Sequence, residues 1–408
     1  MTLFKAINGR KNNCTKESLM KVLMLTWKSF GNEDMIDALK ELGHQVTEQP
    51  FSDKGEKPDE LLEQELTACI RKNAPDFLFS FNYFPVASLA CKKLGVPYVA
   101  WVYDSPYVRL YHYTINYPTN HVFVFDRQQY LEFHNAGIQT VHYLPMAANT
   151  RRLSAMTDFD AFRKTTWYNR HPVAFIGSLY TEKHQFYQRM EGKISPYTKG
   201  YLEGLMAAQI QVYGYNFIQE SLPKNILADM QKALPLTPGA DSVESVEYLF
   251  AQYVVNRQIT ALERRELLSA VAEHHGLDLY TPDQTLKLSN CTNHGPVDYY
   301  DQAPYVFKKA KINLNISLRS ILSGIPLRAF DIMGAGGFLL TNYQEDFLDF
   351  FVPGEDFVFY ESRADLLDKI GYYLKHEAER AQIAENGLRK ISADHTYVHR
   401  VDEILSYL

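Results

Sequence analysis

The sequence has few cysteines and lacks a long apolar run, and both absences narrow the class of protein. Its four cysteines, Cys14, Cys69, Cys91 and Cys291, are widely spaced along 408 residues. This spacing predicts reduced thiols and argues against a disulfide framework or a zinc site. No apolar run reaches the roughly 18 residues of a membrane-spanning helix, and the N-terminus lacks the apolar core of an export signal. We therefore expect a cytoplasmic protein without a transmembrane segment.

The chain also lacks a strong charge of either sign. Its formal net charge is −6, and no long basic block is present, which argues against nucleic acid as the main partner. Hydrophobic residues make up 46% of the chain and charged residues 22%, a balance typical of globular proteins. A chain of this length suits two domains of ordinary size.

The first part of the chain alternates between apolar strands and amphipathic helices. Between residues 21 and 150 a strand, a helix, a glycine and a second strand follow one another three times, with Gly43, Gly95 and Gly137 closing the helices. Glycine after a helix is a common C-terminal cap, and the alternation predicts a parallel doubly wound α/β sheet. We assign residues 21–165 to an N-terminal Rossmann-like domain, preceded by a polar arm at 1–20.

A second α/β unit is predicted for residues 166–395, with a C-terminal helix at 396–408. Its expected strands begin at 172 and resume after 276, whereas residues 182–275 indicate consecutive helices, one with a capping-box start at Thr260. Acceptor recognition, self-association into a homo-oligomer and plain packing are all open roles for this helical insertion. Two doubly wound domains joined by a linker form a cleft at the carboxyl ends of their strands, where ligands bind.

The stretch Ser323-Gly-Ile-Pro-Leu-Arg-Ala-Phe-Asp331 is the most informative motif. It predicts a turn, a short helix with Pro326 at its first position, and then a glycine-rich turn and a buried strand. The free N–H groups of such a helix start suit a phosphate, and Arg328 and Asp331 lie three residues apart on one face. An ordinary crossover helix would show the same spacing.

Residues 311–390, which contain this motif, resemble the C-terminal region of CgeB-like glycosyltransferases, a group with the GT-B fold. In the related group-one glycosyltransferases, two glutamates separated by seven residues occupy this helix and the preceding turn. Ser323 stands at the first position here and Asp331 at the second. The resemblance implies that Asp331 binds the donor ribose and that Gly324 lies at the donor phosphates.

The resemblance extends to the loop after the strand at 172–177. Related enzymes carry an arginine and a lysine there, both on the donor diphosphate. Ser178 replaces the arginine and Lys183 matches the lysine, where its charge would neutralise the leaving group; a solvated lysine is the alternative. Arg319 and Arg328 are candidates to replace the missing arginine, because one guanidinium group can donate hydrogen bonds to two phosphate oxygens at once.

The N-terminal domain supplies the predicted acceptor side. The strand at 96–104 ends in Tyr103-Asp104, where related families carry a His-Asp pair or an acid. Asp104 is a candidate general base or acceptor-positioning group, although an aspartate capping a proline turn is an equally good interpretation. Further candidates are Gly31 and Tyr107 on the acceptor side and His294 near the nucleotide base.

The predicted function is metal-independent transfer of a sugar from a nucleotide diphosphate-sugar, with UDP favoured, to a glycan or protein acceptor. No cofactor is expected, and Asp158-Phe-Asp160 falls in the predicted linker, where a metal-binding Asp-x-Asp motif would not lie. A non-catalytic nucleotide-sugar-binding scaffold and a nucleotide-sugar 2-epimerase are the alternatives. The epimerase would require extra acids and a histidine around the sugar, and the cleft segments contain no such cluster.

Overall fold

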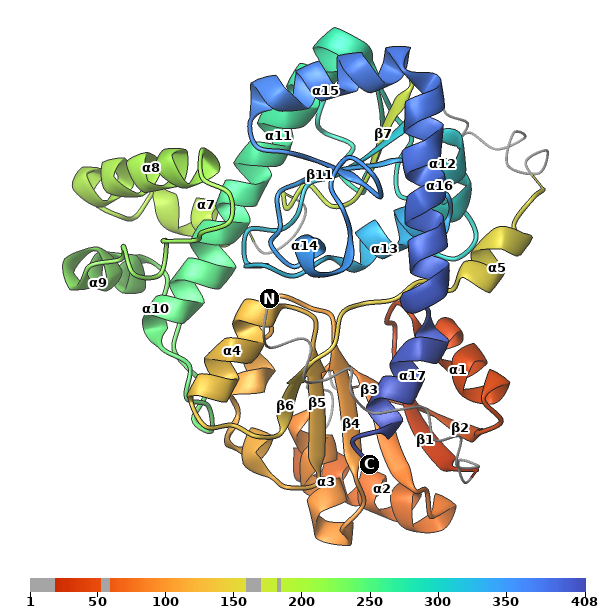
Figure 1. Ribbon diagram of the computed structural model, residues 1–408. Coiled ribbons are helices and arrows are strands. Elements are labelled where there is room, and N and C mark those ends of the chain that lie inside the picture. The colour runs from red at the N-terminus through yellow and green to blue at the C-terminus, as the bar shows by residue number, and fades with distance from the viewer. Residues whose placement is uncertain (1–18, 53–58, 159–169, 182–184) are drawn as a thin grey trace.

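The computed structural model describes residues 19–52, 59–158, 170–181 and 185–408. Two six-stranded sheets, each flanked by helices, lie one above the other (Figure 1), and a cavity lies between the two domains. Every pairing between neighbouring strands is parallel. The predicted fold class, two doubly wound domains facing a cleft with a helical insertion in the second, is confirmed. In the described part of the chain, no helix is long and apolar enough to cross a membrane.

The N-terminal sheet has the strand order β2-β1-β3-β4-β5-β6. Its central strands β3 and β4 are buried on both faces, as expected for a sheet covered by helices on either side. Helix α2 was missed in the sequence, although Leu62, Leu66 and Ile70 repeat at intervals of four residues and are buried. The elements of this domain are β1 (Lys21–Thr26), α1 (Asn32–Glu41), β2 (Gln45–Pro50), α2 (Asp59–Asn73), β3 (Phe77–Phe81), α3 (Pro85–Leu94), β4 (Tyr98–Val102), η2 (Val108–Tyr111), η3 (Tyr113–Asn116), β5 (Asn120–Val124), α4 (Arg127–Asn135), β6 (Val141–Tyr143) and α5 (Thr150–Ala155).

The C-terminal sheet has the order β12-β11-β10-β7-β8-β9. From β7 the chain proceeds outward to β8 and β9, and it then returns to β10 on the other side of β7. This reversal between β7 and β10 creates the crevice in which doubly wound sheets bind ligands. The elements of this sheet and its helices are β7 (Val173–Ile176), β8 (Leu277–Tyr280), β9 (Cys291–Asn293), α12 (Ala303–Lys309), β10 (Ile312–Asn315), α13 (Leu327–Gly334), β11 (Leu339–Asn342), α14 (Phe347–Phe350), β12 (Val358–Tyr360), α15 (Arg363–Lys375), α16 (Glu377–Asp394) and α17 (Tyr397–Leu405).

The helical insertion projects from the side of the C-terminal domain (Figure 1) and has an apolar core of its own, which includes Met190, Leu202 and Met230. Thr260 does not start a helix as predicted: it lies within α11, where its hydroxyl donates to the carbonyl of Asn256 (2.8 Å). A threonine can cap the start of a helix or, when it lies inside one, bond to the carbonyl of the preceding turn, as Thr260 does. The helices are α7 (Phe186–Glu191), α8 (Pro196–Ile210), α9 (Lys224–Ala233), α10 (Val246–Leu249), the π-helical η4 (Phe250–Val255) and α11 (Asn256–His275).

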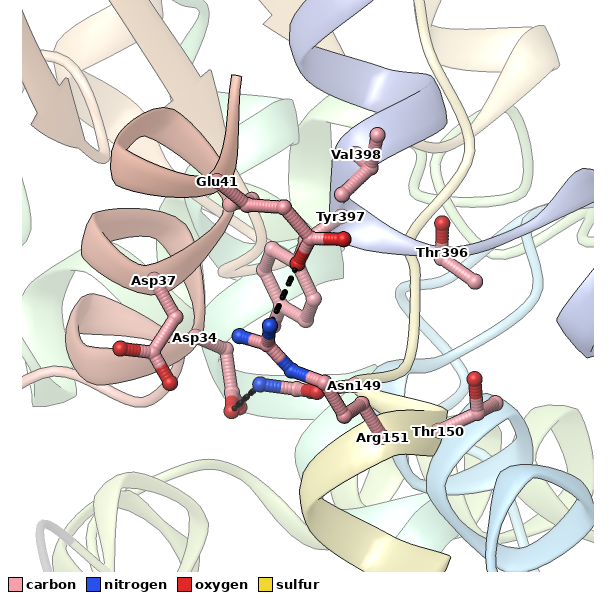
Figure 2. A pocket seen from close by; sticks show the side chains of 10 residues that line it. Asp34, Asp37, Glu41, Asn149, Thr150, Arg151, Thr396, Tyr397 and Val398 are labelled. Atoms are coloured by element: carbon pink, nitrogen blue, oxygen red, sulfur yellow. Dashed lines mark hydrogen bonds and ion pairs between the residues drawn. The ribbon is translucent and has the colours of Figure 1, made fainter. Parts of the chain in front are cut away.

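The chain crosses between the domains twice, at α5 and at α17, and both crossings meet α1. Helix α17 leaves the C-terminal domain and packs on α1 (Figure 1). A small pocket of about 120 Å³ lies at this junction. Figure 2 shows Arg151 paired with Glu41 (3.0 Å) and Asn149 donating to Asp34 (2.9 Å) beside Tyr397. These contacts tie the linker to the first helix.

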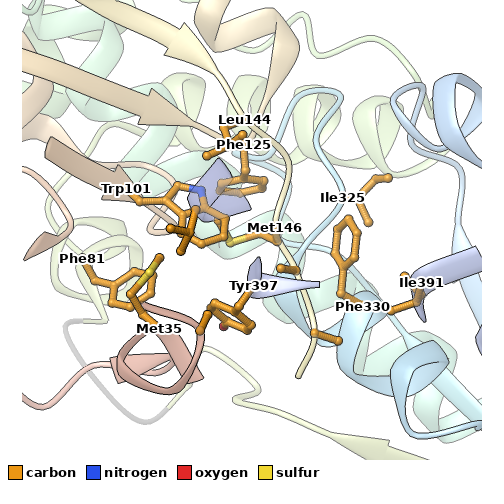
Figure 3. Packing of buried hydrophobic residues seen from close by; sticks show 14 of the residues in the cluster. Met35, Phe81, Trp101, Phe125, Leu144, Met146, Ile325, Phe330, Ile391 and Tyr397 are labelled. Carbon is orange, nitrogen blue, oxygen red and sulfur yellow. The ribbon is translucent and has the colours of Figure 1, made fainter. Parts of the chain in front are cut away.

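One apolar cluster continues from the first domain into the second. Figure 3 shows Trp101 and Phe125 of the N-terminal domain on one side and Ile325 and Phe330 of the C-terminal domain on the other, with Met146, which follows β6, between them. All five side chains are almost fully buried. Burial of this kind is the main favourable contribution to packing, so the two domains form one body rather than two loosely tethered units.

Candidate functional site

A cavity of about 420 Å³ lies between the domains, at the reversal point of the C-terminal sheet. Gly177 and Ser178 follow β7 there, and Ser317 follows β10. The start of α13 and the loop before α12 complete the C-terminal wall. The N-terminal domain contributes an opposite wall of Phe30, Tyr103, Asp104 and Ser105. The carboxyl ends of both sheets therefore face one space, as the sequence predicted.

Two guanidinium groups line the C-terminal wall. Arg264 comes from α11 and Arg328 from α13, and their guanidinium carbons lie 5.3 and 5.6 Å from the ring centre of Phe175. Burial, and then the charge of Arg264, lowers the pKa of Arg328 to about 10. Among the described residues, no carboxylate lies within ion-pair distance of Arg328; its side chain donates to the amide oxygen of Asn315 (3.1 Å). An anion bound between two such groups would relieve their mutual repulsion.

Backbone carbonyls hold Arg264, and a glycine makes room for Arg328. Arg264 donates through Nε to the carbonyl of Ile316 (3.1 Å) and through Nη1 to that of Ser178 (2.5 Å). A Cβ atom at Gly177 would lie 2.8 Å from Nη2 of Arg328, so glycine at this position leaves room for the guanidinium where it now lies. Ser178 lines the cavity, where its carbonyl orients Arg264; its contact with the donor stays a prediction.

Asp331 is the only carboxylate among the described residues of the C-terminal wall. Its side chain is 4% exposed, and Tyr299 donates a hydrogen bond to it (3.1 Å). Burial, followed by the charge of Asp34, raises the pKa of Asp331 to about 7, against the opposing effects of Arg152, Tyr299 and Arg328. The carboxyl group therefore changes its charge close to neutral pH. Helix α13 begins at Leu327, so Pro326 is its cap residue rather than its first helical residue.

The N-terminal wall combines one carboxylate with aromatic rings. Asp104 accepts a hydrogen bond from the amide of Asn82 (2.7 Å); loss of hydration raises its pKa, which this bond partly opposes. The hydroxyl of Tyr103 accepts from the N–H of Phe30 (3.3 Å), and its ring stacks on Trp27 (6.3 Å between ring centres). Both predicted residues, Tyr103 and Asp104, line the cavity.

Two residues that were predicted to contact the donor do not line the cavity. Arg319 is turned into the insertion, where it pairs with Glu263 (2.7 Å) and donates to the carbonyl of Val212 (2.8 Å). The buried side chain of His294 lies against Asp278 (2.7 Å) and stacks on Tyr280 (4.6 Å). Both residues lie close in sequence to a strand end, but the side chain of each pairs with a neighbour inside its own domain. Their predicted contacts with the donor were therefore wrong.

The three remaining described candidates also face protein. A Cβ atom at Gly31 would lie 2.8 Å from the hydroxyl of Tyr397, and one at Gly324 would lie 2.8 Å from Cα of Asp126. Both glycines are therefore required by close protein packing, and neither lines the cavity. Tyr107 is directed away and donates to the carbonyl of Tyr83 (2.7 Å).

Lys183 and Asp160 lie outside the described residues. Within the described ranges, no group of three histidine, cysteine, aspartate or glutamate side chains is placed to hold a metal ion. The expectations that the reaction needs no metal and that Lys183 contacts the diphosphate stay predictions.

Arg264 was missed because it stands in a run of charges, Glu263-Arg264-Arg265-Glu266. One signal was present: Leu267, Leu268 and Val271 follow Arg264 at intervals of three, four and seven residues and are buried. That spacing places Arg264 on the inward face of the helix. A charged residue in phase with an apolar face is a candidate for a buried function.

Comparison with known proteins bears on the fold and on the C-terminal part of the chain. Residues 257–406 match a family model described as glycosyl transferase-like, and the match includes Arg264, Arg328 and Asp331. A glycosyltransferase from Rickettsia africae ESF-5 superposes with a TM-score of 0.52 at 11% identity, covering 96% of this chain and 100% of the other. Anabaena HepE in complex with UDP-glucose gives 0.51 at 13%, covering 95% and 100%. The fold is GT-B. No curated protein matched the sequence, and the CgeB-like subtype stays a prediction.

Proposed function

We propose that this GT-B protein is a glycosyltransferase that transfers a sugar from a nucleotide diphosphate-sugar bound in the cavity. The observation that best supports this proposal is that Arg264, Arg328 and Asp331 line the same cavity of about 420 Å³, at the reversal point of the C-terminal sheet. A nucleotide diphosphate-sugar carries two charged phosphates next to a ribose diol, which are the groups that two guanidiniums and a carboxylate bind.

The C-terminal wall performs the donor half of this reaction. Arg264, Arg328 and the start of α13 bind the diphosphate, and Asp331 accepts a hydrogen bond from a ribose hydroxyl. When the bond between the anomeric carbon and the diphosphate oxygen breaks, the electron pair leaves with the diphosphate. Fixed positive groups at that oxygen stabilise the developing charge without rearranging.

The N-terminal wall performs the acceptor half. The oxygen of an acceptor hydroxyl, on a glycan or a protein, forms the new bond to the anomeric carbon, and its proton passes to Asp104. A carboxylate whose pKa is raised by loss of hydration is a better base than a fully solvated one. The cytoplasmic location and a homo-oligomer formed through the insertion stay predictions from the sequence.

A thermal-shift screen against UDP, GDP, dTDP and CDP tests the donor site. UDP is the first to test, since the HepE structure contains UDP-glucose. A nucleotide at about 100 times its dissociation constant should stabilise the protein by about 2.7 kcal/mol. Arg328→Gln should weaken binding about 10- to 150-fold, the effect of losing a charge-assisted hydrogen bond.

Arg265→Gln is the control, because it makes the same change at an exposed arginine of α11, next to Arg264 but turned to the surface. It should bind the nucleotide as the wild type does. A wild type that no nucleotide stabilises, or an Arg328→Gln variant that binds within threefold of it, would contradict the proposed function. Binding without release of nucleotide diphosphate from any sugar donor would favour the scaffold alternative.

A further inference from the structure

The loop before α13 is held by the N-terminal domain as well as by its own. Ser105 and Ser320 exchange hydrogen bonds, each hydroxyl donating to the carbonyl of the other residue (3.0 Å in both directions). On its other side the loop is bound within the C-terminal domain, where the N–H of Asp346 donates to the carbonyl of Ser323 (3.0 Å). The conformation of residues 320–324 therefore depends on both domains at once.

Asp126 accepts more hydrogen bonds from this loop than any other described residue of the N-terminal domain. It lies two residues after the end of β5, and its side chain is 1% exposed. Its carboxylate accepts from the N–H of Leu322 (2.6 Å) and from the hydroxyl of Ser323 (3.0 Å), and it also caps α4 by accepting from the N–H of Gln128 (3.0 Å). A buried carboxylate that accepts several bonds fixes its donors firmly, since each would be costly to leave unpaired.

The packing around this carboxylate leaves little freedom. The hydroxyl of Ser323 also accepts from the N–H of Gln128 (3.1 Å), and a Cβ atom at Gly324 would collide with Asp126. Ser323 stands where group-one enzymes carry an acid. A second carboxylate at this position would face Asp126 across the contact, so serine suits this partner where an acid would repel it.

We propose that Asp126 is a positioning residue for the donor site: from the N-terminal domain it fixes the loop that sets the start of α13. Arg328 and Asp331 lie on the first two turns of that helix, so they are placed by a contact that does not line the cavity. This inference rests on the proposed function. As a consequence, donor affinity depends on how the N-terminal domain packs against the C-terminal domain, even though Asp126 does not contact the donor.

The neighbouring residue supplies a matched control. Arg127 makes interdomain ion pairs on the same face, with Asp346 and Asp349 of the C-terminal domain, but its side chain makes no contact with residues 320–324 among the described interactions. Arg127→Gln therefore removes ion pairs between the domains and leaves in place the backbone N–H of Asp346 that donates to Ser323. Asp126→Asn keeps one acceptor oxygen but places an amide NH₂ group opposite donors that the second carboxylate oxygen had satisfied, so it loosens the contact with Leu322 and Ser323.

The experiment measures the dissociation constant of UDP by calorimetry, or of whichever nucleotide diphosphate stabilises the wild type in the screen, together with unliganded melting temperatures. Asp126→Asn should weaken nucleotide binding about tenfold, within the usual range of coupling between distant sites, whereas Arg127→Gln should change it less than twofold at a comparable loss of melting temperature. Steady-state kinetics should show a raised donor KM and an unchanged acceptor KM for Asp126→Asn.

If Asp126→Asn does not fold, Ser323→Ala serves instead and should weaken binding about threefold, because it removes one of the hydrogen bonds. Combined with a folded Asp126→Asn, it should add little, since both variants break the same contact. Equal weakening by Asp126→Asn and Arg127→Gln, or unchanged binding in Asp126→Asn, would overturn this inference alone. A wild type that binds no nucleotide would overturn it together with the proposed function.

Discussion

The two walls of the cavity differ in charge and in how firmly their groups are held. The C-terminal wall carries Arg264, Arg328 and Asp331, all of them packed against protein and two of them oriented by backbone groups or by a neighbouring hydroxyl. The N-terminal wall carries one carboxylate, Asp104, and aromatic side chains, of which Phe30 is 49% exposed.

This contrast indicates that the two walls bind different ligands. Prearranged charges bind an anionic ligand without rearrangement during the reaction, whereas exposed aromatic rings offer a wide apolar surface that tolerates varied shapes. The C-terminal wall therefore suits one constant ligand chemistry, and the N-terminal wall suits an acceptor. Substitutions on the two walls should have separable effects on donor binding, acceptor binding and turnover.

The largest expected effect comes from the N-terminal wall. Asp104→Asn should lower kcat by about 10²- to 10⁴-fold, the usual contribution of a general base, because the amide cannot take the acceptor proton. Nucleotide binding, measured by calorimetry, should stay within twofold of the wild type, since Asp104 lies across the cavity from the arginines. A parallel loss of nucleotide binding would show that the two walls do not act separately.

Asp331→Asn should reduce nucleotide affinity about 10- to 150-fold at pH 8, where it removes a charge-assisted hydrogen bond. Affinity in the wild type should rise with pH through about 7 as Asp331 ionises. The variant should lose this contribution and keep only that of the terminal phosphate of the nucleotide, whose second ionisation falls at about pH 6. Titrations at pH 6, 7 and 8 would show this. A pH dependence in the variant equal to that of the wild type would mean that Asp331 does not contribute to it.

The same substitution has a signature in stability. The folded protein holds the Asp331 proton more tightly than the unfolded chain does, so this group lowers wild-type stability as pH rises from about 4 to above 7. Asp331→Asn should therefore melt at a higher temperature than the wild type at pH 8, and the difference should shrink towards pH 4. A lower melting temperature at pH 8 would contradict the raised pKa.

Gly177→Ala tests the placement of one arginine. Its Cβ atom would meet the guanidinium of Arg328 at 2.8 Å, so Arg328 must shift, and nucleotide binding should weaken about tenfold, the equivalent of roughly 1.4 kcal/mol. Acceptor KM should not change. Gly137→Ala is the control, because Gly137 also has a positive φ (+83°) and nothing lies within 4 Å of the added atom; equal effects would exclude displacement of Arg328 as the cause.

The smallest expected effect belongs to the exposed ring on the N-terminal wall. Phe30→Ala should raise acceptor KM about two- to tenfold, as expected for one aromatic contact, and leave nucleotide affinity unchanged. The ring of Phe30 also lies 4.8 Å from that of Tyr299 across the cleft. A change in nucleotide affinity would therefore reveal that this interdomain contact supports Asp331 through Tyr299.

Much of the fold could be predicted from the sequence because it depends on short-range patterns. Buried strands such as β3 and β4 are short apolar runs bounded by turns, and glycines 43, 95 and 137 mark helix ends through their left-handed conformation. The α13 motif placed Arg328 and Asp331 on one face, and both line the cavity. The helical period alone determines that arrangement.

Only the tertiary structure decided which other residues reach the cavity. Arg264 enters it from a helix far from the motif, Arg319 turns away to Glu263, and Gly31 and Gly324 accommodate protein rather than ligand. The contact between Asp126 and Ser323 joins residues 197 positions apart. Local backbone geometry fixes which residues share a strand or a helix face, whereas contacts between domains depend on how the sheets pack together. The sequence therefore determined the walls of the cavity, and packing determined which charges meet within it.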